Sequence, residues 1–310
     1  MRILFYGTPE FALPTLAALL RTHQVVGVVT QPDRPAHRGQ RLTQPPVKVR
    51  AAEAGLPILQ PPRLRDPGWA ERLQAFRPDV AVVVAFGQIL PKVVLDVPAR
   101  GSINVHASLL PRYRGAAPVA WAIMRGETVT GITTFQMDAG MDTGPILLRS
   151  APVAIGEGET AGELTARLAV VGADLLIETL ARLDTLRPES QPHDTATLAP
   201  RLKKADGHLD WARPARELVN RVRGSNPWPG AVTATPKGPL TIWRARAISD
   251  TVDRPHAPGL LVPSGDTLAV AAGQGLVLPT EVQPESRKLV SWSEWLRGAR
   301  LAEGARFTAP

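Results

Sequence analysis

Residues 1–30, MRILFYGTPEFALPTLAALLRTHQVVGVVT, decide the fold of this chain. A β-rich run at 2–6 precedes a helical pattern at 11–20, and a second β-rich run follows at 25–30. A further apolar run, VAVVV, occupies 80–84. Strands that alternate with helices predict an α/β domain with a mostly parallel, doubly wound sheet.

The turn after the first expected strand reads GTPEF, at 7–11. Thr8 can cap the following helix, and Pro9 can occupy its first turn. The turn lacks the G-x-G-x-x-G pattern with which Rossmann-like sheets bind dinucleotides. We therefore expect a Rossmann-like domain without a nicotinamide cofactor.

Composition narrows the class of protein. The chain has 310 residues, enough for two domains, and it is 44% hydrophobic and 21% charged, as is typical of globular proteins. Its longest clear apolar run, at 80–86, is far shorter than the roughly 20 residues that span a bilayer. The first residues do not resemble a signal peptide. We expect a cytoplasmic monomer.

The charged and metal-binding residues set expectations about ligands. The chain has no cysteine, and its six histidines show no metal-binding spacing, so we expect no required metal. The formal net charge of +8 is typical of proteins with a polyanionic partner such as RNA, although many basic proteins bind no nucleic acid.

A polar stretch in the second half divides the chain into two domains. Residues 187–203 begin with RPESQPHDTATLAP, which follows a long helical pattern and is typical of a linker. We expect a catalytic domain at 1–186 and a second domain at 204–310. The second domain contains five short β-rich runs, at 231–235, 240–248, 259–262, 267–271 and 276–282. They predict a small OB-like β-barrel, which could bind nucleic acid or only support the first domain.

The run NVHASLLPRYRGAAP, at 104–118, carries the candidate catalytic groups. Asn104 and His106 are two residues apart, so on a strand their side chains would share one face. An amide and an imidazole could stabilise an oxyanion and move a proton, as attack on an acyl carbon requires. Asp142, in QMDAGMDTG, could orient and charge the imidazole. The alternative is a structural histidine, because N-x-H is a common pattern.

The residues that follow His106 favour the catalytic interpretation. SLLP and RYRG form an irregular polar and basic loop at 108–115, straight after the expected strand. Open α/β sheets bind their ligands at the carboxyl ends of strands. The sequence therefore predicts an acyl-transfer site at this end of the strand.

A basic segment at 31–46, QPDRPAHRGQRLTQPP, contains Arg34, Arg38 and Arg41. It is rich in proline and arginine, and its residues that break helices and strands lead us to expect no regular structure there. Long loops in compact domains tend to be functional or mobile. Two interpretations stay open: an ordinary solvated loop, or an arm that contacts phosphates and orders on RNA.

Tryptophans of the second domain are ambiguous, because tryptophan serves both as a core anchor and as a platform for stacked bases. We expect most of them to belong to the core. The five are Trp211, Trp228, Trp243, Trp292 and Trp295.

These motifs together resemble the family of methionyl-tRNA formyltransferases, which use 10-formyltetrahydrofolate. The resemblance covers nearly the whole chain and includes FYGTPEF, QPDRP, NVHASLLPRYRGAAP, TTFQMDAGMDTGP, LAPRLKKADGHLDW and NRVRGSNPWPGA. The third and fourth motifs are shared with formyltransferases that act on other acceptors. The flanking motifs are similar to those of the tRNA enzymes.

The resemblance implies a reaction and a set of site residues. The formyl group of 10-formyltetrahydrofolate would pass to the free amino group of methionine on initiator tRNA. Asn104, His106 and Asp142 would be the catalytic residues, and the second domain would bind tRNA. The implied folate contacts are Ser108, Leu109, Leu110 and Pro111, and the implied tRNA contacts are Arg34, Arg38 and Arg41.

The basic segment departs from the family pattern. Where the family has G-R-G-K-K-L, this chain has His37-Arg38-Gly39-Gln40-Arg41-Leu42. The loss of one glycine and one phosphate-binding lysine weakens the expectation that this segment discriminates among tRNAs. Two other functions stay open. One is formyl transfer to another amine or hydrolysis of the folate, and the other is tRNA binding without catalysis.

Overall fold

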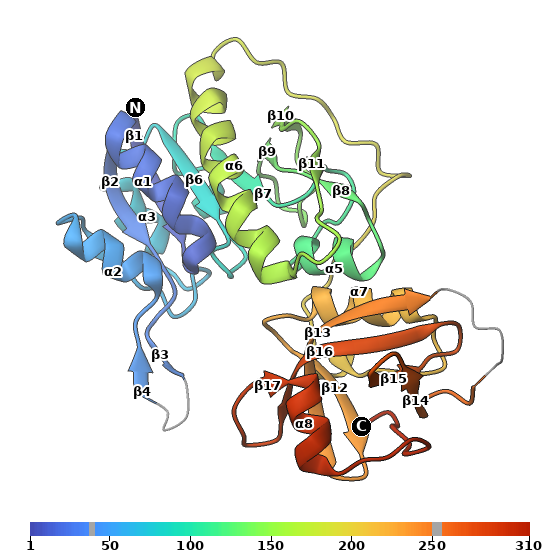
Figure 1. Ribbon diagram of the computed structural model, residues 1–310. Coiled ribbons are helices and arrows are strands. Elements are labelled where there is room, and N and C mark those ends of the chain that lie inside the picture. The colour runs from blue at the N-terminus through green and yellow to red at the C-terminus, as the bar shows by residue number, and fades with distance from the viewer. Residues whose placement is uncertain (37–40, 250–255) are drawn as a thin grey trace. The chain divides into compact units, whose positions relative to one another are not determined.

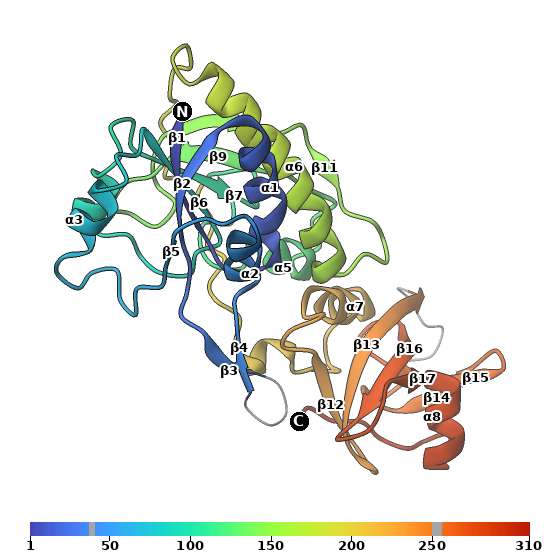
Figure 2. The ribbon, with the colours of Figure 1, turned by 90° about the vertical axis from the view of Figure 1, so that its left-hand side faces the viewer.

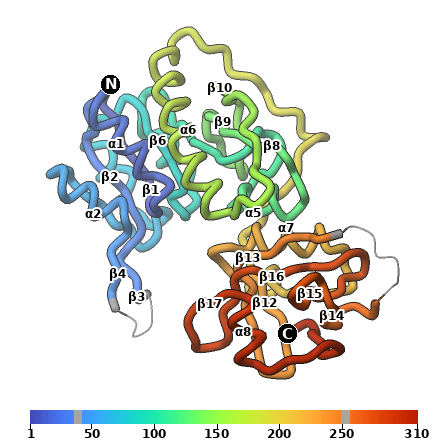
Figure 3. The backbone as a smooth tube through the Cα atoms, viewed as in Figure 1, coloured from blue at the N-terminus to red at the C-terminus, as the bar shows by residue number. Residues whose placement is uncertain are grey.

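The computed structural model describes residues 1–36, 41–249 and 256–310. The chain forms two compact units, and Figure 3 shows its path through both. The first unit comprises 1–118, 130–153 and 165–200, and the second comprises 119–129, 154–164 and 201–310. The stretch expected as a linker therefore belongs to the first unit as far as residue 200.

The first unit is built on a seven-stranded sheet in the order β10-β9-β7-β6-β1-β2-β5 (Figure 1). Its strands are β1 (Arg2–Gly7), β2 (Gln24–Val29), β5 (Ile58–Leu59), β6 (Val80–Val84), β7 (Ser102–His106), β9 (Thr133–Gln136) and β10 (Ile146–Arg149). The first five of these run parallel, whereas β9 pairs antiparallel with both β7 and β10. The prediction of a mostly parallel, doubly wound sheet is confirmed.

Helices cover both faces of this sheet (Figure 2). On one face lie α1 (Leu13–Thr22) and α6 (Ala161–Arg182), where the hydroxyls of Thr179 and Thr134 are 2.8 Å apart. On the other lie α3 (Trp69–Gln74) and α4 (Lys92–Leu95), which contribute to one apolar cluster with β1 and β6. All five residues of β6 are buried, as expected of a strand covered on both sides.

The two units also contain several shorter elements. They are a 3-10 helix (Glu10–Ala12), α2 (Pro46–Glu53), α5 (Pro118–Met124), β8 (Val129–Thr130), β11 (Val153–Ala154) and a second 3-10 helix (Lys204–Gly207). No helix in the described part of the chain is long and apolar enough to cross a membrane.

The expectation that Thr8 caps the first helix is wrong. Pro9 occupies the cap position, and no side chain bonds to the first turn there. The Thr8 hydroxyl instead donates to the carbonyl of Phe86 at 2.8 Å. It therefore ties the turn after β1 to the turn after β6, a contact between distant segments that outweighs the local capping preference.

The expectation that the basic segment lacks regular structure is also wrong. β3 (Arg34–Ala36) pairs antiparallel with β4 (Arg41–Thr43), and Pro35 lies opposite Leu42. Both strands of a two-stranded ribbon are edge strands, so a proline that lacks an N–H group is tolerated there. In Figure 1 the two strands project away from the large sheet.

The second unit is an antiparallel sheet in the order β12-β13-β16-β15-β14, with β17 paired to β16. Its elements are α7 (Ala215–Gly224), β12 (Ala231–Thr235), β13 (Gly238–Ser249), β14 (Leu261–Ser264), β15 (Thr267–Ala271), β16 (Leu276–Pro284), β17 (Val290–Ser291) and α8 (Trp292–Ala299). Near the end of the chain, Thr308 bridges Ala234 of β12 and Arg306 bridges Leu260, next to β14. The last residues thus reach both edge strands, consistent with a small barrel, and the predicted fold class is confirmed.

Aromatic side chains form the centre of the second unit. Trp211, Trp292 and Trp295 are 3%, 3% and 8% exposed and surround Phe307 with ring centroids 6.1 to 6.2 Å away. Trp228 is 51% exposed. The prediction that most of the tryptophans belong to the core is confirmed.

Candidate active site

Asn104 and His106 lie at the carboxyl end of β7, which is hydrogen-bonded on both sides. Asn104 is opposite Val83 of β6 and Phe135 of β9. Two flanking ladders restrict the backbone at this point, so the strand end offers a rigid base for both side chains.

His106 is buried, and its ring nitrogens have different surroundings. Nε2 is 2.9 Å from the carbonyl oxygen of Tyr113, which can only accept, so Nε2 carries a hydrogen. Nδ1 faces Oδ2 of Asp142 at 3.6 Å. The imidazole and the carboxylate therefore face each other at a distance that permits an electrostatic contact when the ring carries both protons.

Asp142 is held by the backbone of the loop that follows β7. Its Oδ2 accepts a hydrogen bond from the backbone N–H of Gly115 at 2.7 Å.

The backbone on either side of His106 is sharply turned. Asp142 has a φ of 54° and Tyr113 a φ of 61°, both in the left-handed region that non-glycine residues seldom adopt. The two residues that contact His106 therefore sit on sharply turned backbone, which fixes their direction of approach.

Two glycines allow these loops to come close. Gly115 has a φ of 119°, and a Cβ there would lie 2.7 Å from the carbonyl oxygen of Ala199. At Gly144 a Cβ would lie 1.8 Å from the carbonyl oxygen of Gln136. Any other residue at either position would push the loops around Asp142 apart.

The carboxamide of Asn104 is the one group of the predicted trio that is left without a protein partner. Asn104 is half-buried, and no side chain or backbone group in the described ranges hydrogen-bonds to its amide. Its N–H groups are therefore available to a ligand at the end of β7.

The four predicted folate contacts divide into two pairs. Ser108 and Leu110 are buried: the Ser108 hydroxyl donates to the carbonyl of Arg112 at 2.6 Å, and Leu110 packs on Phe135. Leu109 and Pro111 are partly exposed. Only this second pair has side-chain surface left for a ligand.

Of the three arginines of the basic segment, the structure describes one side chain. Arg34 is exposed and donates to the side-chain oxygen of Gln31 at 3.0 Å. Arg38 lies outside the described residues, and of Arg41 only the backbone is described. The start of the segment is anchored because Lys48 and Gln60 hydrogen-bond to the carboxylate of Asp33, which lowers the pKa of Asp33.

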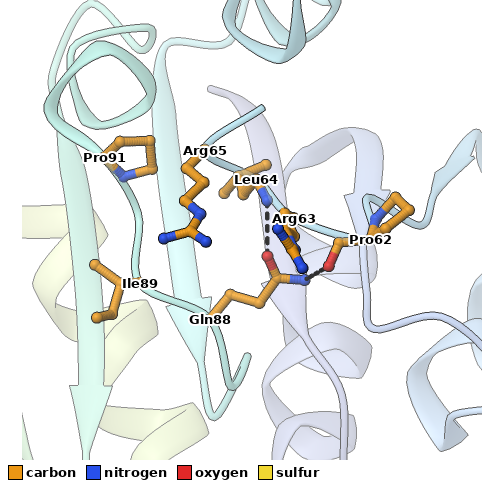
Figure 4. Close-up of a pocket in the computed structure, with 7 residues that line it drawn as sticks. All are labelled: Pro62, Arg63, Leu64, Arg65, Gln88, Ile89 and Pro91. Carbon is orange, nitrogen blue, oxygen red and sulfur yellow. Dashed lines mark hydrogen bonds between the residues drawn. The ribbon is translucent and has the colours of Figure 1, made fainter. Parts of the chain in front are cut away.

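A pocket that no sequence pattern predicts lies beside the turn that follows β6. It has a volume of about 490 Å³ and is lined by Pro62, Arg63, Leu64, Arg65, Gln88, Ile89 and Pro91. Figure 4 shows the segment 62–65 facing Gln88, Ile89 and Pro91 across it. The Gln88 side chain ties the two walls together, because it accepts from the N–H of Leu64 at 2.8 Å and donates to the carbonyl of Pro61 at 2.9 Å.

Arg63 and Arg65 give this pocket its charge. Both are exposed, and neither forms an ion pair with any residue that the structure describes. β6 is hydrogen-bonded to β7, so the pocket and the His106 site follow neighbouring parallel strands at the same edge of the sheet. The run FGQILP after a buried strand was a usable sequence signal, whereas the partner segment 62–65 was not.

Two further residues that no sequence pattern predicts at the site are Arg114 and Gln191, which are 5% and 4% exposed. Gln191 accepts from Arg114 and donates to the carbonyls of Asp142 and Gly144. A buried network thus supports the backbone of Asp142. Within the described ranges, no group of three or more histidine, aspartate or glutamate side chains could hold a metal ion.

Comparison with known proteins relates both units to one family. The family described as formyl transferase matches residues 1–180, and the formyl transferase C-terminal domain matches residues 201–300. A methionyl-tRNA formyltransferase of Solibacter usitatus is 49% identical over 310 residues, which cover 99% of this chain and 98% of the relative. One of Citrifermentans bemidjiense is 48% identical over 309 residues, covering 98% and 95%.

Solved structures support the fold at much lower identity. The sugar 3N-formyl transferase WlaRD, crystallised with dTDP and 5-N-formyl-THF, has a TM-score of 0.65 at 16% identity and covers 93% of this chain and 99% of its own. HypX from Aquifex aeolicus in complex with tetrahydrofolic acid has a TM-score of 0.64 at 17% identity, covering 96% and 47%. At these identities the likeness concerns the architecture alone.

Proposed function

This chain belongs to the family of methionyl-tRNA formyltransferases, and we propose that Asn104, His106 and Asp142 catalyse its formyl transfer to initiator methionyl-tRNA. The observation that carries the assignment is the 3.6 Å His106–Asp142 pair at the end of β7, the strand on which the Asn104 carboxamide hydrogen-bonds to no described residue. These groups match the needs of acyl transfer, namely an oxyanion donor and a means of moving protons.

In the proposed reaction the three residues act on the oxyanion and on the two protons that move. The methionyl amine attacks the formyl carbon, a C–N bond forms, and the carbonyl oxygen becomes an oxyanion. Asn104 donates a hydrogen bond to that oxygen, and Asp142 takes the proton that the amine loses. When the bond to N10 of the folate breaks, His106 supplies the proton that N10 gains. The Tyr113 carbonyl occupies Nε2, so Nδ1 is the nitrogen that gives up this proton.

For the donor we propose 10-formyltetrahydrofolate, as the resemblance implies. Two similar crystal structures contain tetrahydrofolic acid or folinic acid. We assign Ser108, Leu109, Leu110 and Pro111 to one wall of its site, with Leu109 and Pro111 in contact and the other two as support. The glutamate of the folate carries carboxylates and is joined to an aromatic benzoyl group. Its carboxylates suit Arg63 and Arg65, and the aromatic ring suits the apolar side chains of the same pocket.

For the acceptor we propose that the basic segment, with Arg34, Arg38 and Arg41, contacts the tRNA backbone, together with the second unit. Phosphate contacts made by arginine add affinity that falls with salt. We further propose that the protein works as a monomer in the cytoplasm, without a required metal. Sedimentation at working concentration would contradict the first point if it showed a dimer.

A transfer assay tests the proposal as a whole. The purified protein is given 10-formyltetrahydrofolate with initiator methionyl-tRNA, elongator methionyl-tRNA or free methionine. We expect rapid formylation of the initiator alone. Formylation of neither tRNA would overturn the function, whereas equal rates on both would keep the chemistry and refute the role of the basic segment.

A further inference from the structure

We propose that Gln191 is a positioning residue for this reaction, which sets the place of the Asp142 carboxylate from the stretch that sequence patterns predict to be a linker. The inference rests on the proposed function, because it assigns Asp142 a catalytic role. Gln191 lies about fifty positions after Asp142 along the chain, and the inference assigns it no contact with either substrate.

The orientation of the Gln191 amide is fixed by chemistry. Arg114 has only donors, and its Nε and Nη2 both point at Gln191 Oε1, at 3.0 and 2.7 Å. The amide nitrogen must then face the opposite way. There it meets two groups that only accept, the carbonyls of Asp142 at 3.0 Å and Gly144 at 2.7 Å.

Because this network is buried, each of its polar groups needs a hydrogen-bond partner within the protein. Gln191 and Arg114 are 4% and 5% exposed, and no carboxylate in the described ranges forms an ion pair with the Arg114 guanidinium. Neutral acceptors alone satisfy that buried cation: Gln191 and the Nδ1 of His193 at 3.2 Å. Loss of a buried partner leaves a desolvated group unpaired, so Gln191 is held firmly in place.

The segment that carries Gln191 is anchored on both sides of it. Before Gln191, Glu189 and Ile146 of β10 exchange two backbone hydrogen bonds of 2.8 Å. After it, Arg114 donates its N–H to Thr197 and accepts from the N–H of Ala199, at 2.8 and 2.7 Å. The side chain therefore extends from a fixed strand-like segment.

Together these bonds hold Asp142 at two ends. Gly115 N–H binds the carboxylate, and Gln191 binds the backbone carbonyl of the same residue. The 3.6 Å separation from His106 then depends on Gln191, because Asp142 lies on a left-handed turn that has to be supported from outside.

The test is Gln191→Glu, which keeps the length and the acceptor for Arg114 but faces the two carbonyls with a carboxylate. We expect kcat to fall about tenfold to a hundredfold, as small displacements of a reacting group do. KM for donor and tRNA should stay within about twofold, because neither substrate touches the residue. The matched control is Gln283→Glu in the second unit. The Gln283 amide likewise accepts through its oxygen, from the ring N–H of Trp243, and donates through its nitrogen, to the carbonyl of Arg287. This variant should keep the wild-type kcat.

A double-mutant cycle separates positioning from mere stability. In the Asp142→Asn background Gln191→Glu should cost less than about threefold more, because the group that it positions is already disabled. Rates are measured in single turnovers and scaled to the folded fraction from thermal melts. A wild-type kcat in Gln191→Glu, or the same loss in both backgrounds, overturns the inference. Wild-type protein without transfer activity would instead defeat the proposed function.

Discussion

The His106–Asp142 centre and the Arg63–Arg65 pocket lie at the same edge of one sheet and are built in opposite ways. The centre is buried, and backbone groups and a buried amide hold Asp142 and His106 from several sides. The two arginines of the pocket are exposed and make no ion pair with described residues.

This difference indicates a division of labour. Side chains with many fixed partners are already held in one conformation, so they lose little entropy in the reaction. They control the geometry of the reacting groups, and substitutions there should lower kcat. Exposed charges without an ion pair attract a substrate of opposite charge. Substitutions there should raise KM, and the size of that effect should depend on salt.

His106→Ala should have the largest effect. It removes the proposed proton donor and the ring that faces the Asp142 carboxylate, so we expect kcat to fall by about 10² to 10⁴ while KM changes little. Single-turnover formylation of initiator methionyl-tRNA measures this. A kcat within tenfold of wild type would remove His106 from the centre.

Gly115→Ala tests whether close loop approach matters for chemistry. The new Cβ would lie 2.7 Å from the Ala199 carbonyl oxygen and would displace the N–H that binds Asp142. We expect kcat to fall about tenfold or more, together with a loss of roughly 1–3 kcal/mol in stability from the left-handed φ.

The control for that strain is Gly55→Ala. Gly55 has a φ of 66° but nothing lies within 4 Å of its Cβ position. Its change should lower the free energy of unfolding and leave kcat as in the wild type. Equal kcat in both variants would show that the contact with Ala199 is irrelevant to catalysis.

Local sequence patterns predict some elements of this fold to the residue and miss others. β6, β12 and β15 begin and end at the predicted residues, because their apolar runs are bounded by turn residues. The proposed catalytic trio could be singled out because it lies in recognisable motifs. Gln191 could not, since its partners Arg114 and Asp142 are far away in sequence and a polar run without periodicity resembles a linker. β3 and β4 were missed because strand pairing overrode the local signal of proline.

Arg63→Ala and Arg65→Ala should each raise the donor KM about two- to fivefold with kcat unchanged, the size expected for an exposed charge pair. Arg72→Ala is the control, because Arg72 is an exposed arginine nearby in sequence that lies over Trp69 instead. With 10-formyltetrahydropteroate, which lacks the glutamate, the two variants should match wild type. A persistent KM defect with that donor would place the tail elsewhere.

The smallest effect concerns stability in acid. Hydrogen bonds from the Thr160 backbone N–H and from Arg244 lower the pKa of Glu163 from 4.5 to about 2. Because the folded pKa is the lower one, the stabilisation is complete above pH 4.5 and is lost as the pH falls toward 2. Glu163 is half-exposed, so we expect less than about 1 kcal/mol. Urea unfolding of Glu163→Gln should show a weaker pH dependence in this range and a wild-type kcat at neutral pH.

The most direct test of the proposed centre is single-turnover formylation by Asn104→Ala, with donor binding measured on the same preparation. No described residue hydrogen-bonds to the Asn104 side chain, so its loss should leave the fold and the binding of 10-formyltetrahydrofolate within about twofold of wild type. The rate of transfer should fall by about 10² to 10³, as for removal of an oxyanion donor. A rate within tenfold of wild type, or a loss explained entirely by weaker donor binding, would contradict the role of this strand end in catalysis.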